Sequence, residues 1–176
     1  DPTYGVPSTG DVAITGGSIA ATGTIGGNRV VLRAGTGIGT SGARVTTAAN
    51  TLAVNTGGSA FVTETDSVTL DNVVSAGLPV SNTVGGTLDF AANGSVTVGG
   101  IVFAGSGMNV TVGQDLNVAG TPGRSAILTT NGQQTVTASN ISLQGASGGT
   151  NGRAIIANTG GAAAQTINAI GTLRIT

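Results

Sequence analysis

AILTTNGQQTVTASNISLQG, residues 126–145, and AIIANTGGAAAQTINAIGTLRI, residues 154–175, carry the same pattern twice. Each segment contains a short apolar run, a polar turn rich in Gly and Asn, the motif Gln-Thr-Val/Ile-x-Ala and a second alternating run. Val136 in the first segment corresponds to Ile167 in the second, 31 residues further along. A repeat with this period is typical of solenoids and other arrays of small structural units.

Paired alternating runs also occur through the rest of the chain, and each pair is separated by a short corner. Residues i and i+2 of a strand lie on one face, so the apolar members of each run are expected to face a common core. The corners are too short for the usual parallel crossover, and most lack the Asn-Gly loop of a tight hairpin. The pattern predicts an all-β fold, a parallel β-helix (solenoid) of about six to eight rungs. The expected core ladder is Val96, Val98, Ile101, Phe103, Val110, Val112, Leu116, Val118, Val136, Ile141, Leu143, Ile167, Leu173 and Ile175.

The chain is expected to form a lead-in or docking arm over 1–10 and one solenoid domain over 11–176. The segment 72–86 fits the pattern worst, and Pro79 restricts any strand there to an edge or a bulge, so an irregular rung is expected. Glycines at 39–42 and 57–58 are expected to supply corners with positive φ. Earlier inward candidates are Val45, Leu52, Val54, Phe61, Val68 and Leu70.

An antiparallel β-sandwich is the alternative fold. Asn93-Gly94, Asn131-Gly132 and Asn151-Gly152 are each compatible with a two-residue hairpin turn. Asn also suits a solenoid corner because it tolerates the left-handed conformation. The repetition of paired runs favours the solenoid.

The composition restricts the classes of function. The chain has 176 residues, of which 32 are Gly, 7% are charged and 2% are aromatic. Such a composition favours strands and turns over helices. A net charge of −1 provides no basic face for nucleic acid, and no apolar run is long enough to span a membrane. Because it begins at Asp1 without Met or signal peptide, the chain is expected to be a mature, processed or excised segment.

Candidate chemistry is confined to carboxylates and arginines, because the chain has no His, Cys or Lys. This absence excludes Ser-His-Asp and Cys-His sites, so we expect no enzyme and no cofactor. Glu64 and Asp66 share a strand face by spacing, and Asp71 follows one corner later. These three residues are the weak candidates for Ca²⁺, and Glu64 with Asp66 is the candidate carboxylate pair of a carbohydrate-active β-helix.

Two further sets of side chains have regular positions. Arg124 and Arg153 begin the two late repeats, and a basic ladder there could hold an acidic glycan or a neighbouring Asp. The simpler interpretation makes them corner residues whose stems cover apolar surface. The final TLRIT segment has a strand pattern without a cap, so we expect its edge to be covered by further repeats or by another copy.

The segments IGTSGARVTTAANTLAVNTGGSAFVTETDSVTL (38–70) and 126–176 resemble the shaft repeats of filamentous-haemagglutinin-like exoproteins of Gram-negative bacteria. The resemblance covers about half the chain through degenerate motifs, and the NPNG-type motifs of the family's export domain are absent. It implies a right-handed parallel β-helix, two-partner secretion to the cell surface, and a structural or adhesive role in extracellular fibres or biofilm. Expected partners are other copies or further repeats end to end, and surface glycans.

Overall fold

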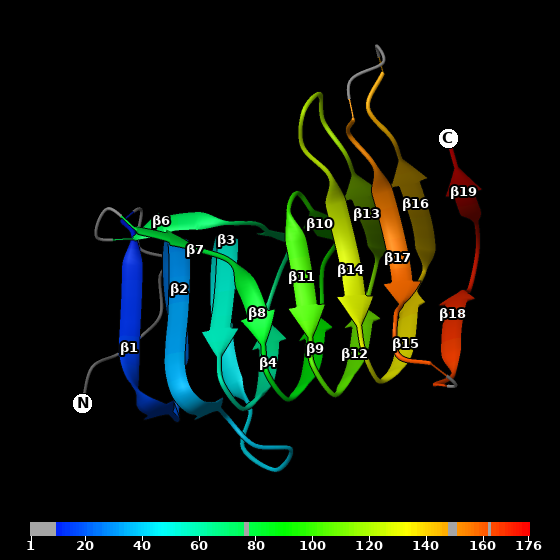
Figure 1. The fold of residues 1–176 in the computed structure, drawn as a ribbon. Coiled ribbons are helices and arrows are strands. Elements are labelled where there is room, and N and C mark those ends of the chain that lie inside the picture. Colours follow the sequence, from blue (N-terminus) through cyan, green and yellow to red (C-terminus); the bar gives the residue numbers. More distant parts are fainter. Residues whose placement is uncertain (1–9, 76–77, 148–150, 162) are drawn as a thin grey trace.

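Residues 10–75, 78–147, 151–161 and 163–176 are described by the computed structural model. Every regular element in these residues is a β-strand, which confirms the predicted all-β class. The strands form a 17-stranded sheet and a separate 2-stranded sheet. The large sheet extends from β1 at one end of the molecule to β19 at the other (Figure 1).

The nineteen strands follow one another without an intervening helix among the described residues. They are β1 (Val12–Ile19), β2 (Thr24–Ile38), β3 (Val45–Thr56), β4 (Ser59–Glu64), β5 (Val68–Leu70), β6 (Val73–Ser75), β7 (Leu78–Val80), β8 (Asn82–Val84), β9 (Thr87–Ala92), β10 (Val96–Val98), β11 (Ile101–Ala104), β12 (Gly107–Val112), β13 (Asp115–Ala119), β14 (Ala126–Thr130), β15 (Gln133–Ala138), β16 (Asn140–Gln144), β17 (Ala154–Asn158), β18 (Gln165–Ala169) and β19 (Leu173–Ile175).

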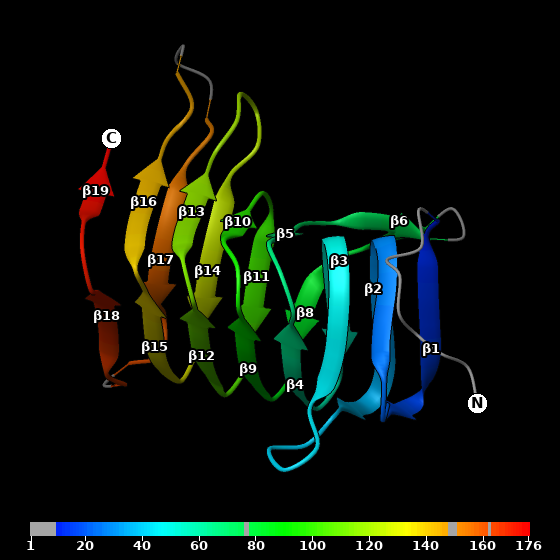
Figure 2. The ribbon, with the colours of Figure 1, turned by 180° about the vertical axis from the view of Figure 1, so that it is seen from behind.

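The strand pairings of the large sheet are parallel, and each joins strands that are separated along the chain. One wall runs through β4, β9, β12, β15 and β18. A second runs through β5, β10, β13, β16 and β19, and a third through β8, β11, β14 and β17. The chain therefore passes from wall to wall around a common core, and the antiparallel β-sandwich alternative is wrong for this sheet (Figure 2).

The register places apolar residues on apolar residues from one end of the sheet to the other. We call one such set the inner column, because most of its members face the core. Parallel neighbours in the sheet lie about 4.8 Å apart, so these side chains pack directly on one another. The inner column is Val12, Val30, Leu52, Leu70, Val98, Val118, Leu143 and Ile175.

The second and third walls merge toward the first strands. Thr51 and Leu52 of β3 pair with β5, whereas Asn55 and Thr56 of the same strand pair with β8. The side chain of Asn82 fills this branch point: its Oδ1 accepts a bond from the Val54 amide at 2.8 Å and its Nδ2 donates to the Leu52 carbonyl at 3.4 Å. One continuous strand can thus support two separate strands of the next turn.

The β6–β7 hairpin lies across the outside of the early strands (Figure 1). It is antiparallel, with Val74 opposite Pro79, and belongs to the segment 72–86 that was expected to be irregular. Val73 and Val80 of the hairpin cluster with Val31 and Ala53, whose side chains point away from the main core. The hairpin therefore covers apolar surface on the outer face of β2 and β3.

Most of the expected core ladder lies in the interior, but not all of it. Ile101 is wrong, with 47% of its surface exposed, and Phe103 is only half-buried. Val102 and Ala104 face the core in their place, because a shift of one residue turns a whole strand over. Phe61 is displaced by Val62 and Ala60 in the same way. The expected residues that are buried are Val45, Leu52, Val54, Val68, Leu70, Val96, Val98, Val110, Val112, Leu116, Val118, Val136 and Ile141.

The last described turn departs from the expected burial for a different reason. Ile167, Leu173 and Ile175 are in register with the buried strands beneath them, yet they are 39%, 51% and 72% exposed. Leu143, one turn earlier, is half-buried and packs against the core. The positions of Ile167, Leu173 and Ile175 in the columns agree with the prediction, but no described strand covers the other side of these residues.

The corner glycines at 57–58 are required for a reason other than positive φ. Among the described glycines, φ is positive at Gly39, Gly123 and Gly161, so the expectation holds for Gly39 and fails for Gly42, Gly57 and Gly58. A Cβ on Gly57 would lie 2.5 Å from the carbonyl oxygen of Gly35. These corners need glycine because successive turns bring backbone against backbone.

Candidate functional site

The three acidic residues considered for Ca²⁺ lie in different environments. The side chain of Glu64 points into the core and is fully buried, whereas Asp66 is exposed at the corner that follows. Asp71 lies beyond β5, and in the described part of the chain no three acidic side chains gather into a metal-binding group. Binding of Ca²⁺ at these residues stays a prediction, and the burial of Glu64 means that Glu64 and Asp66 do not form an exposed carboxylate pair.

Glu64, the last residue of β4, instead has a structural environment beside the first half of β3. Thr47 Oγ1 donates a hydrogen bond of 2.8 Å to Oε2, and the Thr65 amide donates one of 2.9 Å to Oε1. The Ala49 amide lies 3.2 Å from both oxygens. Burial raises the pKa of Glu64 from 4.5 to about 7; the bonds from Thr47 and Ala49 oppose the rise, and Asp66 adds to it.

Raising the pH through the range 4.5 to 7 is expected to weaken the fold through Glu64. The unfolded chain loses this proton near 4.5 and the folded chain near 7, so in this interval the folded state binds more protons. Stability is therefore fully present below 4.5 and declines as the pH rises through 7. The decline is at most about 1 kcal/mol per pH unit, below the full value because solvent at the Asp66 corner screens part of the penalty. Urea unfolding as a function of pH measures it.

Glu64→Gln supplies the matched variant for this pH profile. The amide keeps the size and an acceptor for Thr47 but cannot ionise, so the decline attributed to Glu64 should disappear. Asp66→Asn keeps Glu64 and removes the neighbouring carboxylate that raises its pKa, so the decline should end at a lower pH than in the wild type. A wild-type profile that matches Glu64→Gln across this range would refute the assignment.

Arg124 connects distant turns by binding Asp71. Its Nη1 donates to Asp71 Oδ2 at 2.9 Å, and its Nη2 pairs with Oδ1. The carboxylate reaches the arginine over Gly99 and Gly100, and a Cβ on Gly100 would lie 2.7 Å from Asp71 Oδ1. Arg124 therefore holds a neighbouring Asp, one of the two expected roles, whereas the Arg153 backbone lies beside Ser125 and no arginine ladder forms.

Arg44 was not among the sequence-based candidates, yet it fastens three turns together. Its Nε donates to Thr63 Oγ1 at 2.8 Å and its Nη2 donates to the carbonyls of Val62 and Asp89. Its Nη1 lies 3.1 Å from the Asp89 carboxylate. The residue ends the 39–44 loop, so only its position immediately before an alternating run could have drawn attention to it.

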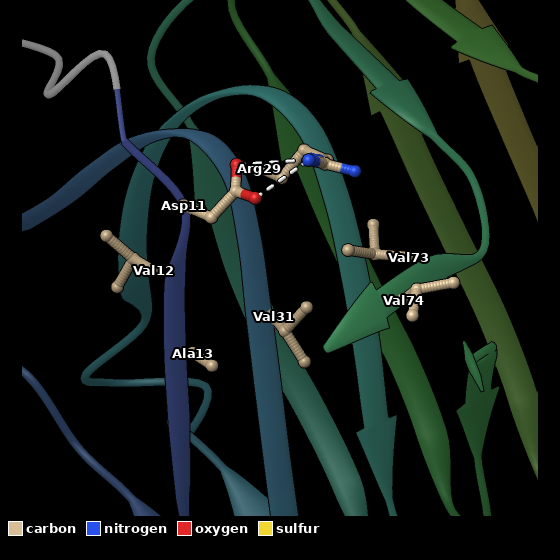
Figure 3. Close-up of a pocket in the computed structure, with 7 residues that line it drawn as sticks. All are labelled: Asp11, Val12, Ala13, Arg29, Val31, Val73 and Val74. Atoms are coloured by element: carbon tan, nitrogen blue, oxygen red, sulfur yellow. Dashed lines mark hydrogen bonds and ion pairs between the residues drawn. The ribbon is translucent and has the colours of Figure 1, made fainter. Parts of the chain in front are cut away.

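A shallow cavity of about 300 Å³ lies beside the first strand (Figure 3). Asp11 and Arg29 form an ion pair of 2.9 Å at its rim, and Val31, Val73 and Val74 form its apolar side. Ala13 of β1 is exposed on the same outer face. The cavity thus combines a charged rim with apolar surface on the outer face of β1 and β2.

A second depression, of about 410 Å³, crosses β9, β12 and β15 on the outer surface. Its walls carry the hydroxyl and amide side chains of Thr87, Ser106, Asn109, Gln133 and Thr135. Neither depression includes Glu64 or Asp66, so neither provides the pocket expected for a carbohydrate-active enzyme. Binding of surface glycans stays a prediction.

The strongest candidate for an interaction site is the open edge formed by β17, β18 and β19. Ile156 of β17 is half-buried, whereas Ile167 and Ile175 of the other two strands are exposed. Within the described residues these strands pair only with β14, β15 and β16, so their other sides carry unpaired backbone groups. An edge with an apolar row and free backbone donors and acceptors is suited to adding another strand layer.

Comparison of the chain with protein-family models, with curated proteins and with solved structures found no match. In the described part of the chain, no helix is long and apolar enough to cross a membrane.

Proposed function

We propose that this chain is a structural or adhesive segment of a secreted bacterial surface protein, without catalytic activity. In this proposal the sheet is a right-handed parallel β-helix of the filamentous-haemagglutinin-like kind, and it forms part of an extracellular shaft or fibre. The observation that carries the proposal is the exposed apolar edge of β17, β18 and β19.

The pairing pattern supports a shaft because each turn contacts mainly the turns beside it. Parallel pairing continues along all three walls, and the columns add similar side chains at each step. In such arrays, stability is roughly a sum of the turns and of the interfaces between neighbours. Length can therefore increase without a change in the cross-section.

The exposed edge supports stacking rather than an isolated rod. Burying an aliphatic side chain such as Ile175 contributes roughly 1.5–3 kcal/mol, and no described strand pairs with the backbone groups of β17–β19 on that side. A further turn of strands would cover both. Such a turn belongs either to more repeats of a longer chain or to another copy.

Electron microscopy of the purified chain over a range of concentrations tests the proposal. We expect particles of constant diameter whose length increases with concentration. Ile175→Lys places a charge on the stacking edge and should weaken association by about 10- to 100-fold, which corresponds to the apolar burial that is lost.

Ile101→Lys is the matched control, because Ile101 is also exposed but lies on the outer surface between other turns. It should leave the length distribution unchanged. Short particles of uniform size for the wild-type chain at high concentration would count against a stacking shaft.

A further inference from the structure

The two unpaired edges of the large sheet are complementary in direction. Among the described residues β1 pairs only with β2, at one end of the molecule, and β19 pairs only with β16, at the other (Figures 1 and 2). All strand pairings between β1 and β19 are parallel, so the two strands run in the same direction. The side of β1 without a described partner faces one end of the molecule, and the corresponding side of β19 faces the other end. A second copy can therefore continue the sheet in the same direction.

The inner column shows which residues would meet. It begins at Val12 and ends at Ile175, and each step between them joins two apolar residues. Val12 and Ile175 are the two members that have a described neighbour on only one side. Adding one step places Ile175 of one copy against Val12 of the next.

A second column gives the same register independently. It joins Ile14, Leu32, Val54, Asn82, Val102, Leu128 and Ile156. Ile14 and Ile156 are half-buried and pack against the core, each with one side uncovered by a described strand. The step that joins Ile175 to Val12 therefore also brings Ile156 to Ile14.

Charge favours this register as well. The outer column beside the inner one runs through Arg29, Thr51, Thr69, Thr97, Asn117, Ser142 and Arg174. Asp11 immediately precedes Val12, and its carboxylate forms an ion pair of 2.9 Å with Arg29. Asp11 therefore continues this column. Arg174 is exposed and has no ion-pair partner among the described residues. Stacking would place Arg174 of one copy on the side of Asp11 that faces away from Arg29 in the next copy.

The cross-sections of the two edges differ, but the molecule already contains the required junction. β1 is one continuous strand, whereas β17 and β19 belong to separate walls. Inside the chain, β3 meets β5 and β8 with the order reversed, because the two separate strands follow the continuous one. Pairing between one continuous strand and two separate strands is thus a geometry that this sequence adopts.

We infer that the partner of the β17–β19 edge is the β1 edge of a second copy, stacked head to tail in the register that joins Ile175 to Val12 and Arg174 to Asp11. The inference rests on the proposed function and specifies its partner. It is a heterologous contact, which produces filaments when it does not close into a ring.

Disulfide trapping tests the register, and the chain has no native cysteine to interfere. Ala13 follows Val12 as Thr176 follows Ile175, and both are exposed, so the two side chains should meet across the contact. Neighbouring strands lie about 4.8 Å apart, within the Cα separation of about 4.4–6.8 Å that a disulfide needs. Oxidation of a mixture of Ala13→Cys chains and Thr176→Cys chains should give a cross-linked dimer, whereas either chain alone should give none.

Thr15→Cys replaces Ala13→Cys in the matched control. Thr15 lies on the same face two residues further along β1, so its Cα would be roughly 8 Å from that of Thr176 across the contact, which exceeds the reach of a disulfide. Equal cross-linking of the Ala13 and Thr15 variants would overturn the register. Elongated particles without an Ala13–Thr176 product would also overturn it, while leaving the shaft proposal intact.

The charge contact has its own measurement. Arg174→Glu should lower the association constant by about five- to tenfold at low ionic strength, and the effect should shrink in 1 M salt, where the Debye length is about 3 Å. Arg153→Glu makes the same change in net charge at an exposed residue outside this column and should have a much smaller effect. Equal effects of the two variants would remove the Arg174–Asp11 contact from the inference.

Discussion

Phe90→Ala should lower the free energy of unfolding by about 3–5 kcal/mol. Phe90 is 1% exposed and lies in one column between Val62 and Val110. The strands on either side are fixed by backbone pairing, so they cannot move inward to fill the space that the ring leaves. Urea unfolding followed by far-UV circular dichroism gives the change in stability.

Phe103→Ala is the control that separates the loss of a ring from the loss of core. Phe103 is half-buried and faces the outside of its wall, since Val102 and Ala104 occupy the core positions of β11. Its truncation should cost less than half as much as that of Phe90. Similar losses for the two variants would mean that the assignment of faces in β9 or β11 is wrong.

Gly85→Ala should destabilise the chain by about 3 kcal/mol or more, because it adds a methyl group where two backbones touch. The new Cβ would lie 2.3 Å from the carbonyl oxygen of Gly57. The turns must separate to admit it, which weakens the bond of 2.9 Å from the Gly85 amide to the Thr56 carbonyl. A fall of about 6–12 °C in Tm is expected for a chain of this size.

Gly42→Ala provides the same substitution at a place with space for it. No atom lies within 4 Å of a Cβ on Gly42, and its φ is not positive. Its stability should stay within about 0.5 kcal/mol of the wild type. A large loss at Gly42, or none at Gly85, would contradict the explanation by backbone contact.

The late repeat made the strand register of the last turns predictable. Val136 pairs with Ile167, as the correspondence between the two segments predicts, and Leu143 pairs with Ile175 in the following strands. Two similar segments of a repeating parallel sheet occupy equivalent positions, so their alignment gives both the strands and their register. Exposure could not be predicted in the same way, because it depends on which strands cover the far side.

A single error of register explains why the acidic residues were misplaced. The sequence prediction set Phe61 inward, which would place Glu64 on the outer face. The structure pairs Val45 with Val62, so even-numbered residues of β4 face the core and Glu64 is buried. Alternating runs of Thr, Ala and Val look similar in either register, and the paired strand decides between the two.

The ion pairs that join distant turns could not be predicted from spacing. Arg44 reaches Asp89, and Arg124 reaches Asp71, across turns whose lengths differ. A charged side chain at a corner has no period along the chain, and its partner depends on how many residues each intervening turn contains. Only the assembled columns show which carboxylate lies within reach.

The glycine corner between the third and first walls has a mechanical consequence. Gly35, Gly57, Gly85 and Gly105 follow one another in successive turns, with carbonyl oxygens close to the next glycine. Rotation of one turn about the long axis would drive these oxygens into the neighbouring backbone. This row of close backbone contacts therefore resists twisting of the molecule about its long axis. Twisting under load must instead deform the corners that carry side chains and loops.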